Sequence, residues 1–188
     1  AFAREGFSIL DKKREVLTAE LLRVAGEAES INQQAQVLFK DAYQALELAR
    51  LSMGQERIEW AAMAVTHSVD VNVVNHGMMG VPIPQVEAHG EPPAISYSLG
   101  DTSVALDVSN EAFCKVLQII PRLSELSVSV WRLSRELIKT QRRVHALEKI
   151  FIPQYEETIL FIENTLEEQD REEIFTLKWL KSHQSSQT

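Results

Sequence analysis

The sequence predicts a mainly α protein: a long antiparallel two-helix coiled coil with a small central β-hairpin element. Two long stretches, in the N-terminal third and the C-terminal half, carry apolar residues at steps of four and three. The seven glycines and six prolines are few for 188 residues, and several lie in one segment between those stretches. Valines that alternate with polar residues in this segment indicate strand.

Residues 1–65 are predicted to form the first helix. Its seam has two neighbouring rows, one mostly of large residues and one mostly of alanines. The alanine row lets the backbone of a partner helix approach closely. The seam residues are Leu17, Leu21, Val24, Ala28, Ile31, Ala35, Leu38, Ala42, Ala45, Ala49 and Ser52. We expect packing to hold the helix through Gly26 and Gly54. Since Ala1 already lies within the helical pattern, we expect the native first helix to be longer.

Residues 66–106 are predicted to form the β-hairpin and loop segment, at the far end of the rod from both termini. One strand is expected around Val69–Val73 and another at Ile95–Leu99, with turn residues between Asn75 and Gly80. A loop is expected at Glu87–Pro93. We expect this segment to be removable without melting the coiled coil.

Residues 107–181 are predicted to form the second helix, with 182–188 as a frayed polar tail. Its seam is Ala112, Val116, Ile119, Leu123, Leu126, Val130, Leu133, Leu137, Thr140, Val144, Leu147 and Phe151. Asp107, Ser109 or Asn110 can cap its start. The seam slips in phase near Phe151, and Pro121 and Pro153 are each expected to bend the helix.

The short connection requires the two helices to be antiparallel. We therefore expect Leu17 to lie opposite Phe151–Tyr155, and the first few residues to lie opposite the acidic segment Glu163–Glu173.

Composition excludes several function classes. A net charge of −8 argues against nucleic acid or anionic lipid as the main partner. One cysteine, Cys114, excludes an internal disulfide. No apolar run approaches the roughly 20 residues that a membrane span needs, so we expect no direct membrane insertion and a cytoplasmic location.

The sequence offers no catalytic, cofactor or metal motif, so we expect no enzyme and no cofactor. The five histidines are scattered, and no glycine-rich phosphate loop occurs. The acidic segment fits a solvated helix face better than a paired-carboxylate site. Trp60, Trp131 and Trp179 can be interface anchors or can belong to the core or the edge of the seam.

Three stretches carry a family resemblance. They are Ala3–Gly6 followed by Lys12–Glu15, then Met79–Pro84, and above all Arg142–Ile159, which reads RRVHALEKIFIPQYEETI. The chain resembles the D subunit of the V-type/A-type rotary ATPases along nearly its whole length, with His145 where the family usually has asparagine.

This resemblance implies the central rotor axle of the ATPase. Such an axle couples ATP hydrolysis or synthesis in the catalytic A/B hexamer to rotation of the membrane ring and translocation of H⁺ or Na⁺. It implies three partners: the hexamer at the terminal end, the F subunit on the middle, and the funnel-shaped subunit above the membrane ring at the other end. We expect few large apolar patches at the terminal end, which must turn inside the hexamer.

Two sets of contact residues follow as expectations. The residues expected to face the hexamer are Arg4, Lys12, Lys13, Arg14, Glu167, Glu168, Glu172 and Lys178. Trp60, Phe113 and Trp131 are expected to face the F subunit. The alternative hypothesis is a stand-alone coiled-coil adaptor or tether with the hairpin as its docking module, because heptads alone specify only helix association.

Overall fold

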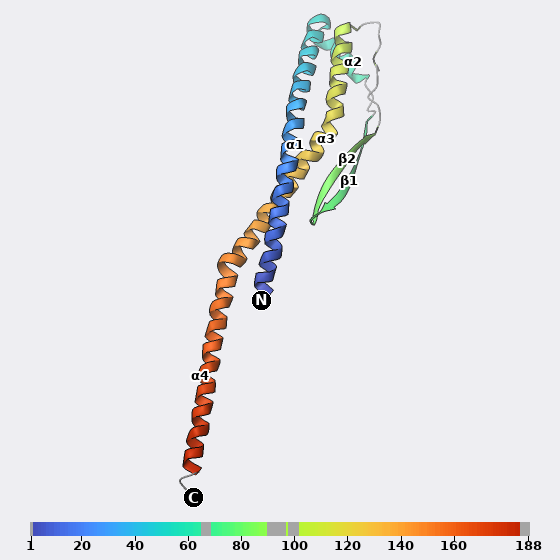
Figure 1. Cartoon of the computed structure of the whole chain (residues 1–188). Helices are drawn as coiled ribbons and strands as arrows, with labels where there is room; N and C mark the ends of the chain where they lie inside the picture. Colours follow the sequence, from blue (N-terminus) through green and yellow to red (C-terminus); the bar gives the residue numbers. More distant parts are fainter. Residues whose placement is uncertain (1, 65–68, 90–96, 98–101, 185–188) are drawn as a thin grey trace. The chain divides into compact units, whose positions relative to one another are not determined.

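The computed structural model describes residues 2–64, 69–89, 97 and 102–184. The fold is mainly α with one two-stranded antiparallel sheet, which confirms the predicted class. The elements in chain order are α1 (Phe2–Met53), α2 (Gln55–Met63), β1 (Asp70–Met78), β2 (Val81–His89), α3 (Val104–Ala146), the π-helix η2 (Leu147–Phe151) and α4 (Ile152–Gln184) (Figure 1). The chain divides into two units. The larger unit is Glu15–Ile138, and the smaller unit is Ala1–Arg14 with Lys139–Thr188.

Within the larger unit, α1 and α3 form the predicted antiparallel seam. Every seam residue of α1 from Leu17 to Ala49 is buried or half-buried, as is every seam residue of α3 from Ala112 to Leu137. The alanine row is the tightest part: Ala35, Ala42 and Ala49 expose 1%, 0% and 0%. Small side chains let the α3 backbone come close, and this close approach excludes water from the seam.

The first helix does not run through Gly54, so that expectation was wrong. α1 ends at Met53, where the N–H of Gly54 donates to the carbonyl of Arg50 over 2.9 Å. Gly54 has φ +83°, a conformation open to glycine but costly for other residues. Gly26 remains within α1, as expected.

The hairpin turn is Met79-Gly80, with φ +50° and +80°. Positive φ at both central residues is the type I′ turn, which matches the twist of the flanking strands. The turn lies at the end of the range Asn75–Gly80 predicted to hold turn residues: Gly80 is part of it, whereas Asn75 to Gly77 belong to β1. Residues 87–89 of the predicted loop belong to β2. The predicted strand at Ile95–Leu99 lies outside the described residues, apart from Tyr97.

Pro82 and Pro84 lie in β2 without disturbing its ladder. The N–H of Val86 points away from β1, since it donates to the Glu125 carboxylate on α3. N–H groups alternate direction along a strand, so positions 82 and 84 also face away from β1. A proline there removes no hydrogen bond of the sheet.

The hairpin folds back along the coiled coil instead of lying at the far end of the rod (Figure 1). Val81 exposes only 4%, and it shares a buried cluster with Leu17, Val24, Leu126 and Leu133. The hairpin is therefore part of the core of the larger unit, and the expectation that it can be removed without melting the coiled coil does not fit this packing.

The helix register also differs from the expectation. Leu17 packs in the cluster with Leu126 and Leu133, and Arg4 pairs with Glu156 instead of the acidic segment. A shift by one heptad leaves apolar residues facing apolar residues, so the seam pattern alone does not determine the register.

The second helical run differs from the prediction at its start and is irregular near Phe151. α3 begins at Val104, so the expected caps Asp107, Ser109 and Asn110 lie inside it. At the predicted phase slip, Leu147–Phe151 form a π-turn in which the N–H of Ile152 bonds to the carbonyl of Leu147. Pro153 has no N–H and its ring excludes the carbonyl of residue 149, so widening the helix just before the proline accommodates it.

Candidate interaction surfaces

The described residues contain no group of His, Cys, Asp or Glu side chains that could hold a metal ion. Among the helices described here, none is both long and apolar enough to cross a membrane. The candidate functional features are therefore surfaces of the helices and of the hairpin.

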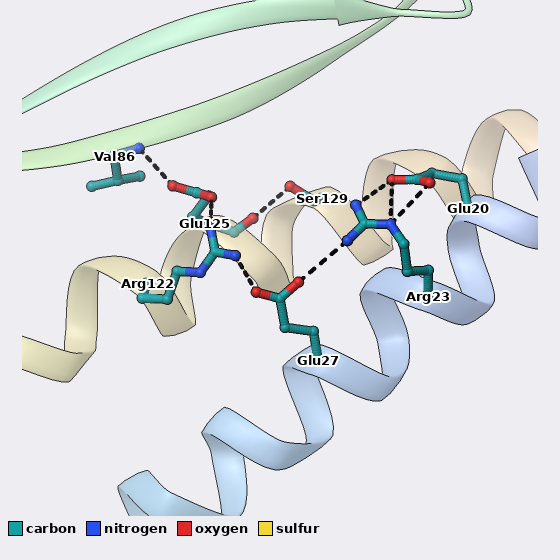
Figure 2. Close-up of polar contacts among 7 residues, drawn as sticks. All are labelled: Glu20, Arg23, Glu27, Val86, Arg122, Glu125 and Ser129. Atoms are coloured by element: carbon teal, nitrogen blue, oxygen red, sulfur yellow. Dashed lines mark hydrogen bonds and ion pairs between the residues drawn. The ribbon is translucent and has the colours of Figure 1, made fainter.

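One surface is a chain of charges that joins α1, α3 and β2 (Figure 2). On α1, Arg23 pairs with Glu20 over 2.5 Å and with Glu27 over 3.5 Å. Arg122 of α3 then bridges Glu27 and Glu125. The Glu125 carboxylate accepts the N–H of Val86 over 3.1 Å. The hydrogen bond from Arg23 lowers the pKa of Glu20.

A second charged side chain of α3 also grips the hairpin backbone. Arg132 donates to the carbonyl of Pro82 over 2.7 Å and to Asn75 Oδ1 over 3.0 Å. Glu125 and Arg132 therefore contact both an N–H and a carbonyl on the outward edge of β2. These contacts determine how the hairpin lies on α3, while Val81 supplies the apolar contact.

In the smaller unit, most of the residues expected to face the hexamer are exposed, and their ion pairs differ from those expected. Arg4 forms a 2.5 Å ion pair with Glu156, and Arg14 pairs with Asp11 over 2.7 Å. Glu167 and Glu168 pair with Arg171 of their own helix over 3.7 and 3.8 Å. Lys12, Glu172 and Lys178 are exposed, and Lys13 is half-buried.

α4 presents more apolar surface than expected. Every residue from Pro153 to Trp179 is exposed, including Ile159 at 52%, Phe161 at 70% and Phe175 at 72%. The expectation of few large apolar patches at this end stays a prediction, but exposed apolar side chains are numerous here. The helix still forms because consecutive turns satisfy its backbone, but its apolar side chains remain available to partners.

The structure brings together two of the three residues expected to face the F subunit. Trp60 of α2 lines a pocket of about 480 Å³ with Ala61 and Tyr97. Phe113 of α3 lines a neighbouring pocket of about 140 Å³ that shares Ala61 and Tyr97. Phe113 also meets Tyr43 edge-on, with ring centroids 5.7 Å apart.

Trp131 lies elsewhere, 18 residues further along α3, or about 27 Å at 1.5 Å per residue. Its ring is 60% exposed, and the Arg135 guanidinium lies 5.4 Å from the ring centroid. An exposed tryptophan under an arginine has an apolar face and a charge within reach of one partner.

The sequence did not single out Tyr97 as important for this region. Its O–H donates to Asp107 Oδ1 over 2.7 Å, which ties the segment before α3 to that helix. Burial and this hydrogen bond raise the pKa of Tyr97 to about 12. The available signal was an aromatic residue within a segment rich in serine, glycine and proline.

Comparisons with known proteins agree with one another. A family model described as the ATP synthase D subunit matches residues 1–182. The V-type ATP synthase D subunit of Thermotoga neapolitana is 35% identical over 95% of this chain and 88% of its own length. The A-type ATP synthase D subunit of Pyrococcus furiosus is 36% identical over 96% and 86%. The V-type ATP synthase D subunit numbered 2 in Treponema pallidum is 36% identical over 99% and 89%.

Proposed function

The chain belongs to the ATP synthase D-subunit family, and we propose that it is the central-stalk rotor shaft of a V-type/A-type ATPase. In this role it couples ATP hydrolysis or synthesis in the catalytic A/B hexamer to rotation of the membrane ring and so to movement of H⁺ or Na⁺. It is a non-catalytic stalk subunit of the complex, peripheral to the membrane on its cytoplasmic side.

The packing of the coiled coil carries this proposal. A shaft that transmits torque must resist twisting and bending along its length. The seam from Leu17 to Ala49 supports this because Ala35, Ala42 and Ala49 of its alanine row are buried and close-packed interiors deform little. The buried hydroxyl of Ser129 carries no desolvation penalty for an unpaired polar group, because it donates to the carbonyl of Glu125 over 2.6 Å.

We assign the partners by region. The smaller unit, with Arg4, Lys12, Lys13 and Arg14 near its start, would face the hexamer. The F subunit would contact the larger unit through Trp60, Phe113 and Trp131. The end of the coiled coil around Gly54, where α1 ends, would dock on the funnel-shaped subunit above the membrane ring.

Charge reversal in the smaller unit tests the coupling. We expect Lys12→Glu, Lys13→Glu and Arg14→Glu together to reduce ATP hydrolysis by the assembled ATPase, because catalytic interfaces would sense the axle's angle through these charges. Lys40→Glu, on α1 of the larger unit, serves as the charge control. Unchanged coupled hydrolysis in the triple variant would show that these charges are not sensed.

The competing hypothesis is the stand-alone adaptor or tether. Its docking module would be the hairpin, but Val81 and the contacts of Glu125 and Arg132 hold that hairpin against the coiled coil. Gel filtration with the F subunit and with the A/B hexamer separates the two hypotheses. A one-to-one pair that enters the hexamer supports the axle, whereas a self-dimer that ignores both supports the tether.

A further inference from the structure

A single residue, Gly54, joins α2 to α1. α1 ends at Met53 and α2 begins at Gln55. The N–H of Gly54 still makes the α-helical bond to the carbonyl of Arg50 over 2.9 Å, but the dihedral angles of Gly54, φ +83° and ψ 155°, leave the helix. A return of these two angles to helical values would make α1 and α2 one continuous helix.

The position of α2 beside the coiled coil is weakly held. Ala61 and Ala62 line a pocket with Phe113 of α3, so α2 folds back along the coil. None of its residues is buried, and no side chain caps its start. Trp60 and Met63 expose 74% and 84%. In a continuous helix, the first N–H groups of α2 would instead bond to the last carbonyls of α1.

The docked hairpin limits where α2 can lie, because the chain leads from α2 into β1. On β2, the carbonyl of Pro82 accepts from Arg132. The N–H of Val86 donates to Glu125, seven residues earlier on α3, so β2 runs toward the start of that helix. Asp70, the first residue of β1, pairs with the residue three positions beyond Val86, about 10 Å further in that direction. It therefore lies roughly 14 residues, or about 21 Å, inside α3.

The length of the connection makes a docked hairpin and a continuous helix incompatible. Ser52 meets Ser103 at the start of α3, with their hydroxyl oxygens 2.9 Å apart. In a continuous helix, Ala64 would lie 12 residues beyond Ser52, about 18 Å past the coil. Its distance from Asp70 would be about 40 Å, whereas the six peptide units between them span at most about 21 Å.

We propose that Gly54 is a hinge and that the docked hairpin is the strap that keeps α2 folded back. When the hairpin leaves the coil, α2 joins α1 and lengthens the first helix by ten residues, about 15 Å. The helical pattern that the sequence carries through Gly54 fits this second state. The proposal goes beyond the shaft function, since it concerns two states of this chain itself.

Gly54→Ala and Gly26→Ala form a matched pair for the test. An added Cβ meets nothing within 4 Å at either site, so crowding plays no part. Alanine disfavours the dihedral angles of residue 54 in the folded-back state, whereas Gly26 already lies within α1. We expect Gly54→Ala to weaken hairpin docking and to speed hydrogen exchange of the Val86 amide at least about fivefold. Gly26→Ala should not speed it.

The second measurement is a distance between spin labels on the full chain, obtained by double electron–electron resonance. The labels are placed at Met63→Cys on α2 and Gln118→Cys on α3, both exposed, with Cys114→Ser. The folded-back state gives a distance below about 25 Å, and the continuous helix gives about 40 Å. We expect only the short distance without further changes. The long one should appear when Gly54→Ala is combined with Arg132→Ala, which removes two hydrogen bonds to the hairpin.

Three results would overturn the proposal. One is only the short distance in Gly54→Ala/Arg132→Ala at unchanged helix ellipticity, which removes the hinge. Another is the long distance without Gly54→Ala while the Val86 amide stays protected, which removes the strap. If the double variant loses its ellipticity, the single variants decide, and equal Val86 exchange in Gly54→Ala and Gly26→Ala is the third.

Discussion

Replacing Val81 by alanine tests whether the hairpin is part of the core. Val81 exposes 4%, so Val81→Ala removes two buried methyl groups. At about 0.8 kcal/mol per buried carbon group, with a further contribution from the cavity left behind, the loss is about 2 kcal/mol. With an m-value of about 2 kcal/mol/M in urea, the unfolding midpoint should fall by about 1 M.

Val71→Ala is the matched control in the same hairpin. Val71 exposes 53%, so its loss should stay below about 0.8 kcal/mol and shift the midpoint by less than about 0.4 M. Any loss of strand propensity is common to both variants.

The signal to follow is ellipticity at 222 nm, which reports the helices, α1 and α3 among them, and not the hairpin. A docked hairpin couples the loss at Val81 to helix unfolding. If Val81→Ala shifts the helix midpoint no more than Val71→Ala, the hairpin does not stabilise the coiled coil and the packing argument is refuted.

Three further predictions concern the hairpin and the segment before α3. Removing the acceptor in Glu125→Ala should speed hydrogen exchange of the Val86 amide about tenfold, worth about 1.4 kcal/mol; an unchanged rate would mean that the contact does not protect it. Gly80→Ala should destabilise the hairpin by about 1 kcal/mol because φ is positive there, whereas Gly77→Ala should not, although neither site would crowd a new Cβ. Absorbance titration should show one of three tyrosines, Tyr97, ionising at about 12. An unfolded tyrosine ionises near 10, so the contribution of Tyr97 to the free energy of unfolding should be fully present below about pH 10 and be lost as the pH rises toward 12. Tyr97→Phe should remove that loss.

The seam could be predicted because it depends only on the spacing of apolar residues within each helix. Steps of four and three along one stretch place side chains on one helix face whatever the rest of the chain does. The π-turn followed the same logic, since a slip in the apolar spacing together with Pro153 indicated an irregular helix just there.

The register and the hairpin position could not be predicted, because they depend on contacts between distant residues. Sliding α1 by one heptad leaves the seam intact, and only particular pairs such as Glu27 with Arg122 distinguish the alternatives. Likewise, nothing in the sequence distinguishes Val81 from the other valines of the hairpin. Its burial follows from its contacts with the distant residues Leu17 and Leu133.

The exact position of the turn was not predicted, for a different reason. Asn75, His76 and Gly77 have the composition of a turn, but the residues with positive φ are Met79 and Gly80. Gly80 was among the predicted turn residues, but methionine seldom adopts that conformation, so residue preferences did not single out Met79-Gly80 within the range. Trp60 and Phe113 were found in the sequence as isolated aromatic residues, and their grouping around α2 emerged only from the packing.

The π-turn at Leu147–Phe151 also acts as an angular offset built into the second helix. It holds one residue more than an α-helical turn would, and each residue of an α-helix advances about 100° around the axis. Deleting that one residue would rotate every side chain of α4 by about 100° about the helix axis, while the helix would stay continuous. The direction in which each side chain of α4 points around the helix axis thus depends on the one extra residue in this turn.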